Sequence, residues 1–460
     1  MSANDTAVTV LFTVDSLRSD ALPTDGVVSA LGERGTVFEH AFAQGNWTPF
    51  SFPSILGAEQ VFNDSGDIGV ADAPTLAETL SDAGVSTAGF NGANGFLTEH
   101  WGYDRGFDDF ESFTSGTGDS LYSKYLTAHP TVQAWLQVAA SPIRRLFGKR
   151  GGARNVSRML DVEHRAIDFV EEAEPPFFLW VHYMDVHTPY VPAPKFVRDE
   201  TGTKVGSLKM LRAHARAGLG REVSDDSLAD LESLYRAASR QVDASVGRVL
   251  SALDRRGVRD DACIVLTGDH GEEFMEHGHL AHYPKLYEEL VHVPLIVRTP
   301  DDGPKSKRGN EDTVECAVGL DSIPATICDT MGVEHDFSSG SLLGDASDRV
   351  PVTSVAVRGT HVTQQPIPRR LKDGELLVSA RTADWSYIYH TESGNRELYD
   401  RRRDPTEQEN SWDEHEGSEF AGRLHDAVEN RIDDIETDGR SESVELPSDV
   451  TNRLEALGYQ

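Results

Sequence analysis

The chain has 460 residues, of which 38% are hydrophobic, and carries a formal net charge of −33 at neutral pH. This length exceeds what one compact core usually holds, so we expect a large domain with a smaller companion. The acidic residues are spread along the whole chain, which argues against a general nucleic-acid binder. No stretch approaches the roughly 18 consecutive apolar residues of a membrane-spanning helix, so we expect a soluble protein.

The N-terminus and the cysteines bear on the cellular compartment. Residues 1–15 lack the basic region and the long apolar stretch of a signal peptide, which predicts a cytoplasmic protein. Cys263, Cys316 and Cys328 are scattered without metal-type pairing, so we expect free thiols. The dense acidic composition, with more Arg than Lys, resembles that of proteins from salt-loving archaea and predicts a halophilic protein.

Apolar segments of strand length alternate with helical patterns along the chain. The segments are VTVLFTV (8–14), FFLWVHYM (177–184), CIVLTG (263–268) and VPLIV (293–297). Continuous apolar runs of this kind are typical of strands buried on both faces of a parallel sheet. The clearest helix covers 228–253, where apolar residues repeat at intervals of three and four, and should end near Gly257. This alternation predicts an α/β fold with a doubly wound, mostly parallel sheet.

The pattern of apolar and polar residues changes near residue 345. Short alternating segments follow, which predict a small antiparallel sheet closed by a helix. We therefore divide the chain into a large α/β domain over 1–345 and a smaller subdomain over 346–460. Residues 300–312 form a polar loop, and we interpret the acidic stretch 414–445 as solvated surface.

One basic segment, 144–158, runs against the acidic trend. It could contact a membrane surface or hold an anionic substrate, but pairing with the protein's own carboxylates is the interpretation we favour. Its charged residues are Arg144, Arg145, Lys149, Arg150, Arg154 and Arg158.

Polar residues directly after the apolar segments are candidates for chemistry, because ligands of doubly wound sheets bind beyond the carboxyl ends of the strands. Asp15, the turn with Asp185 and His187, and Asp269-His270 stand at such ends. An isolated Asp there also serves as a turn or helix cap. Asp269-His270-Gly271-Glu272 is more specific, because it joins a carboxylate and an imidazole where Gly271 allows a sharp turn.

Asp15, Asp269 and His270 together predict a site for one divalent metal ion. They supply ligands from separate segments of the chain, as a metal site requires. Their mixed oxygen and nitrogen atoms suit Ca²⁺, Mg²⁺, Mn²⁺ or Zn²⁺ without choosing among these ions.

Seven segments carry a family resemblance that runs almost from end to end. They are VLFTVDSLRSDAL (10–22), PTLAETLSDAGVSTAGF (74–90), RGFDDFESF (105–113), FFLWVHYMDVHTPYVP (177–192), VLTGDHGEEFMEHG (265–278), LYEELVHVPLIV (286–297) and GNRELYDRRRDP (394–405). Through them the chain resembles the sulfatases of the alkaline phosphatase superfamily. The resemblance implies the same α/β architecture with a small C-terminal antiparallel sheet, but it identifies no substrate.

The resemblance also implies roles for individual residues. Asp15, Asp269 and His270 would bind the catalytic metal, with the nucleophile as a further ligand. His187 would contact the ester near the leaving group, and His282 would contact it where many relatives carry Lys.

Three further residues have less defined places in the family pattern. His277 lies in the matched EHG element, and two interpretations stay open. It could contact the substrate directly, or it could lie away from the substrate, facing solvent or behind the site. We interpret His182 as a core histidine under the end of its strand. Ser16 stands where many sulfatases have a second acidic ligand, so we expect fewer protein ligands around the metal here.

The stretch GNWTPFSFPSILG (45–57) occupies the place of the nucleophile. Formylglycine sulfatases have Cys or Ser there, followed by x-Pro-x-Arg, whereas the alignment brings Thr48, Phe50 and Phe52 to the nucleophile, Pro and Arg positions. The modification signal is therefore missing. A Thr hydroxyl bound to a metal is still a competent nucleophile. Two alternatives stay open: Ser51 in a shifted register, or Thr48 only capping the next helix.

These observations predict a metal-dependent hydrolase of sulfate or phosphate esters with a metal-bound Thr nucleophile. The substrate would be a small-molecule, glycan or lipid-linked ester. Because a Thr nucleophile resembles the phosphodiesterase and phosphoglycerol-transferase branches, a transferase of that type is one alternative. A protein that binds sulfated or phosphorylated glycans or lipids without cleaving them is the other.

Overall fold

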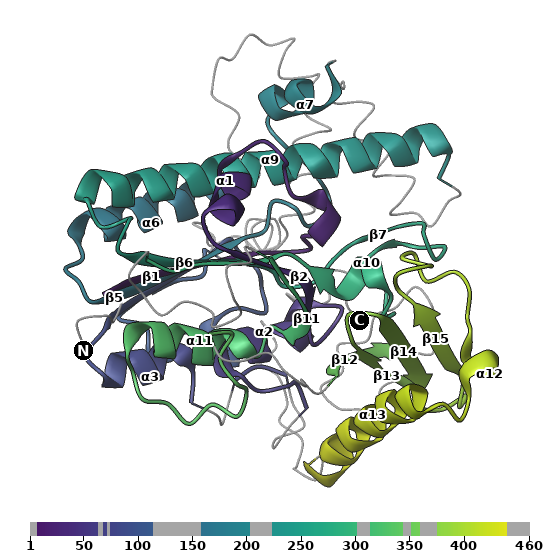
Figure 1. Cartoon of the computed structure of the whole chain (residues 1–460). Helices are drawn as coiled ribbons and strands as arrows, with labels where there is room; N and C mark the ends of the chain where they lie inside the picture. The colour runs from purple at the N-terminus through teal and green to yellow at the C-terminus, as the bar shows by residue number, and fades with distance from the viewer. Residues whose placement is uncertain are drawn as a thin grey trace, which may run out of the picture.

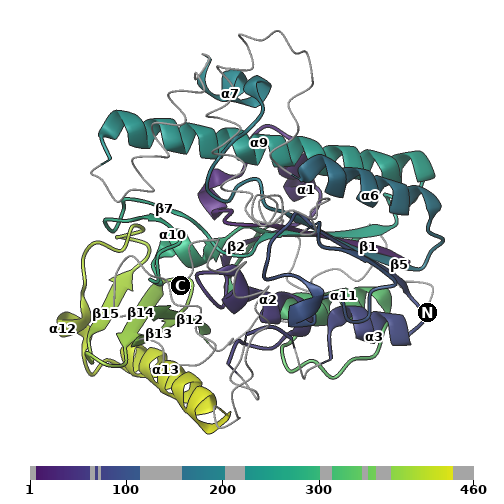
Figure 2. The ribbon, with the colours of Figure 1, turned by 180° about the vertical axis from the view of Figure 1, so that it is seen from behind.

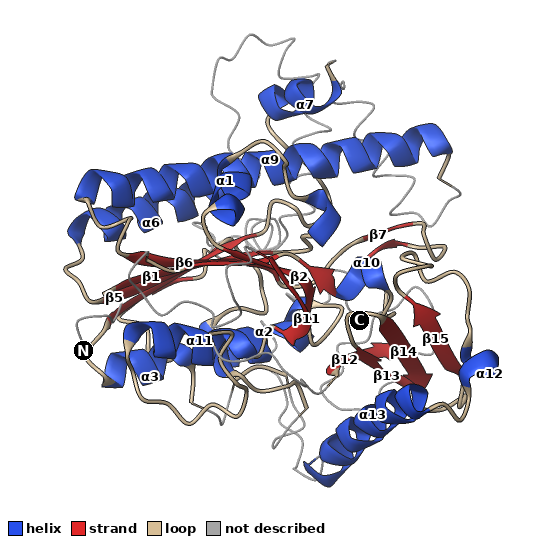
Figure 3. Ribbon diagram, viewed as in Figure 1, coloured by secondary structure: helices blue, strands red, loops and turns tan. Residues whose placement is uncertain are grey.

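The computed structural model describes residues 7–62, 68–70, 74–113, 158–202, 223–300, 313–343, 351–358 and 375–438. Within these ranges the chain forms a main sheet between two layers of helices and a separate small sheet (Figures 1 and 3). Of the basic segment 144–158, only Arg158 lies in the described part, where it forms an ion pair with Asp161. The rest of that segment, the loop 301–312 and the proposed boundary at 345 lie outside the described residues.

The main sheet confirms the predicted parallel architecture. The described strands lie in the order β11-β2-β10-β6-β1-β5-β3-β4, and β9 also pairs with β2. All neighbours are parallel except β9 and β10, which run antiparallel to the strands they contact. The bounds are β1 Val8–Val14, β2 Thr36–Phe42, β3 Ser86–Asn91, β4 Asp109–Glu111, β5 Phe177–Tyr183, β6 Ala262–Gly268, β9 His292–Val293, β10 Leu295–Arg298 and β11 Thr313–Gly319.

Proline divides one predicted strand in two. Pro294 lies between β9 and β10, since it has no N–H to donate to a sheet ladder. The segment 293–297 is therefore not one continuous strand.

Helices cover both faces of the main sheet, as Figures 1 and 2 show from opposite sides. One layer contains α1 (Val27–Glu33), α6 (Met159–Glu172) and α9 (Asp225–Arg256). The other contains α2 (Thr48–Gly57), α3 (Leu76–Asp82) and α11 (Ser322–Met331). Side chains of β1 alternate between the two cores, with Phe12 beside the first layer and Leu11 beside the second. Both faces are buried, which explains the continuous apolar strand sequences.

The predicted long helix is confirmed as α9. It ends at Gly257, which adopts the left-handed φ of 69° that a glycine tolerates well at a helix C-terminus. None of the helices in the described residues combines the length and apolarity needed to cross a membrane. None of the three cysteines, all of which lie in the described residues, forms a disulfide, and Cys263 and Cys328 are buried.

The C-terminal part is an antiparallel sheet with one long helix against it. Strands β12 (Val352–Arg358), β13 (Glu375–Arg381), β14 (Trp385–His390) and β15 (Arg396–Asp400) follow one another in order. Helix α13 (Glu419–Asp438) buries Leu424 and Val428 in the shared core. The interpretation of 414–445 as solvated surface is therefore wrong for this face of α13. Apolar residues recur at helical spacing among the acidic ones, so the helix is amphipathic and buries one face.

The small sheet joins the main part directly before α2. Val355 N–H donates to the Gln44 carbonyl at 2.8 Å, and Ser354 Oγ donates to the Ala43 carbonyl at 2.6 Å. The edge strand β12 thus holds the segment that leads into Thr48. The remaining described elements are the 3₁₀ turns Ser19–Ala21 and Glu99–Trp101, α7 (Pro194–Thr201), β7 (Glu273–Phe274), β8 (Leu280–Ala281), α10 (Glu288–Val291) and α12 (Trp412–His415).

Candidate active site

The predicted metal ligands meet at the carboxyl edge of the main sheet. Asp15 follows β1 and Asp269 follows β6, and these neighbouring parallel strands place Val14 beside Gly268. Asp15, Asp269 and His270 are fully buried, and one ligand atom from each lies within 4.8 Å of the others. Within the described residues this is the one group of three or more acidic, His or Cys side chains with such spacing.

The hydrogen bonds around this group leave ligand atoms available for a cation. Asp269 Oδ1 accepts from the N–H groups of Ser16 at 3.0 Å and His270 at 2.9 Å. Asp269 Oδ2 has no hydrogen-bond partner among the described residues. His270 Nδ1 donates to the Gly271 carbonyl at 2.9 Å, and its Nε2 lies 3.6 Å from Asp15 Oδ1. A buried carboxylate oxygen without a donor, facing a second carboxylate and an imidazole nitrogen, fits a divalent ion.

The electrostatics of the group lead to the same interpretation. Burial and the charge of Asp15 raise the pKa of Asp269 well above its usual value. Burial also acts to raise the pKa of Asp15, but His187, His182 and His270 outweigh it and hold that pKa below the usual range. Burial, assisted by His282, lowers the pKa of His270 to about 4, so its imidazole is neutral. A bound cation would relieve the repulsion between the two carboxylates.

Thr48 lies beside these groups, at the start of α2. Its Oγ1 is 3.4 Å from Asp15 Oδ2 and 3.4 Å from His270 Nε2. Trp47 is the N-cap residue of α2 and Thr48 is the first residue of the helix, so Thr48 does not occupy the N-cap position. Ser51 Oγ instead faces the carbonyls of Trp47 and Thr48 within its own helix, at 3.4 Å each.

Ser16 makes two hydrogen bonds to the predicted metal ligands. Its φ of 59° lies in the left-handed region, which directs its N–H toward Asp269. Its Oγ donates to Asp15 Oδ1 at 2.9 Å. Gly271 has a different role from the sharp turn that the sequence suggested. It is not in the left-handed region; a Cβ there would lie 1.9 Å from the Glu289 carbonyl oxygen.

Asn94 is a site residue that the sequence analysis missed. Its Nδ2 donates to Asp15 Oδ2 at 2.8 Å and lies 3.2 Å from Thr48 Oγ1. Asn91, the last residue of β3, holds this turn by accepting the Asn94 N–H at 2.9 Å. A usable signal was present, because these polar residues directly follow a strand of the same sheet edge.

The two histidines predicted to contact the ester lie together over the site. The ring centroids of His187 and His282 are 5.0 Å apart, and those of His282 and His270 are also 5.0 Å apart. His187 Nδ1 donates to the Thr188 carbonyl at 2.6 Å, which leaves Nε2 as its other polar atom.

The other two histidines are in different surroundings. His182 is fully buried, as expected of a core residue, with Nδ1 2.9 Å from Thr13 Oγ1. Its Nε2 nevertheless reaches within 3.7 Å of Asp15 Oδ2. His277 does not face solvent, because its Nδ1 lies 2.7 Å from Glu289 Oε1 and its Nε2 3.0 Å from the Glu407 carbonyl.

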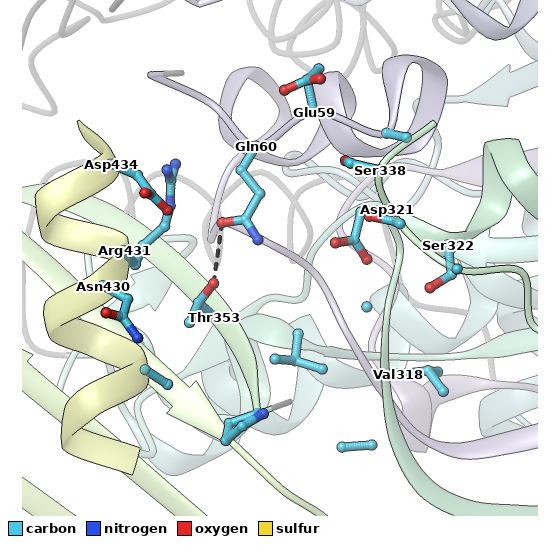
Figure 4. Close-up of a pocket in the computed structure, with 18 residues that line it drawn as sticks. Glu59, Gln60, Val318, Asp321, Ser322, Ser338, Thr353, Asn430, Arg431 and Asp434 are labelled. Atoms are coloured by element: carbon cyan, nitrogen blue, oxygen red, sulfur yellow. Dashed lines mark hydrogen bonds between the residues drawn. The ribbon is translucent and has the colours of Figure 1, made fainter. Parts of the chain in front are cut away.

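A separate cavity of about 470 Å³ lies between the end of α2, β11, β12 and α13. Figure 4 shows its polar lining, including a hydrogen bond between Gln60 and Thr353. None of the predicted metal or catalytic residues lines this cavity. It is distinct from the cluster at the sheet edge.

The chain shows a family match that covers the site. The sequence model of the family described as Sulfatase matches residues 9–333. The chain belongs to the sulfatase family. Within the part of the chain that the structure describes, the family match includes every predicted metal ligand together with Thr48, His187 and His282.

Individual sulfatases and related hydrolases resemble the chain more distantly. It is 26% identical over 294 residues to the uncharacterized sulfatase YidJ of Escherichia coli, covering 61% of this chain and 56% of that protein. It is 29% identical over 183 residues to an N-acetylglucosamine-6-O-sulfatase of Bacteroides thetaiotaomicron, covering 38% of this chain and 31% of the relative. The matches thus span less than two thirds of these relatives.

Solved structures share the fold over almost the whole chain. The structure of BT4656 with its substrate D-glucosamine-2-N,6-O-disulfate superposes with a TM-score of 0.68 at 17% identity, covering 95% of this chain and all of the other. A phosphonate monoester hydrolase of Agrobacterium radiobacter gives 0.66 at 18% identity, covering 94% and 96%. The fold class is confirmed, including the small C-terminal sheet.

Proposed function

We propose that this protein is a metal-dependent hydrolase of sulfate or phosphate esters and that Thr48 is its nucleophile. The observation that carries the proposal is the position of the Thr48 hydroxyl. Thr48 is buried at the N-terminus of α2, and its hydroxyl oxygen lies 3.4 Å from both Asp15 Oδ2 and His270 Nε2. The positive end of a helix dipole favours an anionic ester group at that place.

Asp15, Asp269 and His270 would hold one divalent ion, with Thr48 Oγ1 as a further ligand. When bound, the ion would lower the pKa of the Thr48 hydroxyl and reduce negative charge on the transferred group. Asn94 would orient both Asp15 and the nucleophile, since its amide reaches each of them. Ca²⁺, Mg²⁺, Mn²⁺ and Zn²⁺ all remain compatible with these ligands.

The reaction would have two steps, transfer of the ester group to Thr48 and hydrolysis of the Thr48 ester, and the protein's own side chains would act in both. Thr48 gives up its proton to solvent, and its Oγ1 forms a bond to sulfur or phosphorus as the bond to the leaving oxygen breaks. His187 gives that leaving oxygen a proton. His282 offsets charge on the non-bridging oxygens. Water, deprotonated by His187, next attacks the Thr48 ester and frees sulfate or phosphate. The departing Thr48 Oγ1 takes up a proton from solvent, which restores the hydroxyl.

The names of the relatives support both classes of ester. One relative is an N-acetylglucosamine-6-O-sulfatase, and BT4656 has a disulfated glucosamine as its substrate. A similar fold belongs to a phosphonate monoester hydrolase. The Thr at position 48, in place of a residue that can become formylglycine, favours phosphoesters, with transfer to an alcohol as the alternative to hydrolysis.

A panel of 4-nitrophenyl esters tests this proposal. We would compare the sulfate, the phosphate and the bis-ester of phosphate at high salt, with Mn²⁺, Mg²⁺, Ca²⁺ and Zn²⁺ added singly. We expect metal-dependent cleavage, with the phosphoesters preferred. Binding of the esters without turnover under every condition would favour the non-catalytic alternative.

Substitutions at residue 48 test the nucleophile. We expect Thr48→Ala to abolish turnover and Thr48→Ser to retain part of it, because serine keeps the hydroxyl. Ser51→Ala is the matched control and should behave as the wild type. Turnover that survives Thr48→Ala but is lost in Ser51→Ala would assign the nucleophile to Ser51 instead.

A further inference from the structure

Glu272 is a buried carboxylate next to the metal ligands, yet it is not part of their cluster. Its side chain is inaccessible to solvent. Oε1 accepts a hydrogen bond from the Tyr190 hydroxyl at 2.7 Å. Oε2 lies 3.5 Å from His282 Nδ1. Neither of these two atoms has a hydrogen-bond partner among the described residues.

The backbone of the His282 loop is fixed independently of Glu272. Asn46 Nδ2 donates to the carbonyls of His282 at 3.3 Å and Tyr283 at 2.9 Å. Ala281, directly before His282, has a left-handed φ of 67°. These constraints hold the position of the loop without involving the imidazole ring. The ring is buried and packs against the rings of His187 and His270, whose centroids each lie 5.0 Å away. Among the described residues, Glu272 is the carboxylate within ion-pair distance of this ring.

Tyr190 connects the same carboxylate to the loop that carries His187. Tyr190 follows His187 by three residues, and its ring packs edge-on against Tyr235 with centroids 5.4 Å apart. Its hydroxyl therefore approaches Glu272 from a rigid position. One carboxylate thus lies between the loops of His187 and His282, whose rings are 5.0 Å apart.

We propose that Glu272 is a positioning residue that orients the His282 ring toward the ester, and that Tyr190 holds Glu272 in place. This inference rests on the proposed role of His282. A carboxylate beside Nδ1 favours the ring orientation in which Nε2 lies on the side of the ring away from Glu272. Without it, the ring would sample other orientations and contact the substrate for a smaller fraction of the time.

A double-mutant cycle in the full-length protein tests the inference. The variants are Glu272→Gln, His282→Ala and their combination, assayed for kcat and KM with the 4-nitrophenyl ester that the wild type cleaves fastest. We expect Glu272→Gln to lower kcat by about 10- to 100-fold with little change in KM. In the His282→Ala background the same change should cost less than about twofold, because its target is gone.

Tyr190→Phe provides a graded version of the test. It removes the hydroxyl that holds Glu272 but keeps the ring, so we expect a loss of about three- to tenfold in kcat. Tyr183→Phe is the matched control, because it removes another buried hydroxyl, which accepts from Ser245 Oγ at 3.2 Å. That control should retain wild-type kinetics.

Three outcomes would overturn the inference. One is an additive loss in the double variant, which would mean that Glu272 acts independently of His282. Another is loss of the bound metal in Glu272→Gln, which would make it a part of the metal site. The last is wild-type kcat in Glu272→Gln. If Thr48→Ala and His282→Ala both keep full turnover, the proposed function itself fails, and this result is distinct from the other three.

Discussion

The carboxyl edge of the main sheet and the junction with the small sheet both bury charged groups, but they balance the charge differently. At the junction each charge faces an opposite one. Arg381 and Glu407 are buried 3.1 Å apart, and Arg401 contacts Glu288 at 2.6 Å. At the sheet edge, Asp15 and Asp269 face each other, and among the described residues only histidines lie within ion-pair distance of them.

This difference separates a structural site from a functional one. A buried ion pair that is complete in itself fixes how two parts of a protein pack, and removing one partner leaves the other charge uncompensated. A cluster of buried carboxylates with an unsatisfied oxygen is incomplete until a cation from solution binds. The junction should therefore govern folding stability, whereas the sheet edge should govern turnover.

Asp269→Asn gives the largest expected effect on turnover. The substitution keeps an acceptor at Oδ1 but removes the charge and one ligand oxygen. We expect turnover to fall by about 10⁴-fold and metal affinity to fall with it. The metal-free variant should unfold at the same or a higher temperature than the metal-free wild type, because a repulsive buried charge is gone.

Metal content and thermal unfolding, each measured with and without a chelator, check this prediction. The wild type should gain stability on metal addition, and the variant should not. A variant that still binds one ion per chain and turns over normally would contradict the assignment of Asp269 as a ligand.

Glu407→Gln gives the largest expected effect on stability. It removes the nearer of the two carboxylates beside the fully buried Arg381 guanidinium and leaves only Glu288, at 4.0 Å, among the described residues. We expect a loss of about 3 kcal/mol in the free energy of unfolding, measured by denaturant titration. Glu171→Gln is the control, since it breaks the exposed pair with Arg255 and should change stability by less than about 0.5 kcal/mol. A comparable loss in both variants would contradict the contrast between junction and surface.

The sequence predicted the sheet, and the convergence of three polar side chains at its edge, for a physical reason. Asp15, Asp269 and His270 follow strands whose apolar sequences are unmistakable, and the ends of parallel strands meet at one edge. Asn94 and Glu272 were missed because their roles depend on side chains that are distant in sequence, such as Thr48 and His282. The domain division, the cytoplasmic location and the halophilic character stay predictions.

Asn94→Ala should have an intermediate effect on turnover. The change removes the amide that binds both Asp15 and Thr48 but leaves the proposed ligands Asp15, Asp269, His270 and Thr48 in place. We expect kcat to fall by about 10- to 100-fold while one ion per chain remains bound. Steady-state kinetics with parallel metal analysis would distinguish this result. Loss of the ion together with activity would instead place Asn94 among the groups on which metal binding depends.

His277→Gln should have the smallest effect, and its sign depends on pH. Burial acts to lower the pKa of His277, but Glu289 and the Glu407 carbonyl outweigh burial and raise it above its ordinary value. A raised pKa in the folded state means that the charged pair with Glu289 stabilises the fold below the unfolded-state pKa. This contribution is lost as pH rises through the folded-state pKa. We therefore expect the variant to lose about 1 kcal/mol relative to the wild type at about pH 6, and much less at about pH 9.

Denaturant unfolding of the wild type and the His277→Gln variant, each at both pH values, measures the difference in their free energies of unfolding. The pH dependence common to the two proteins cancels in this difference. His335→Gln is the control, because its contact with Asp329 at 3.3 Å lies away from the junction. An equal loss at both pH values would mean that His277 stabilises the junction by packing on Tyr287 and not through its charge. The junction would then depend at this point on ring stacking, and the charge pairing that stabilises it would come from other described pairs, such as Arg381–Glu407 and Arg401–Glu288.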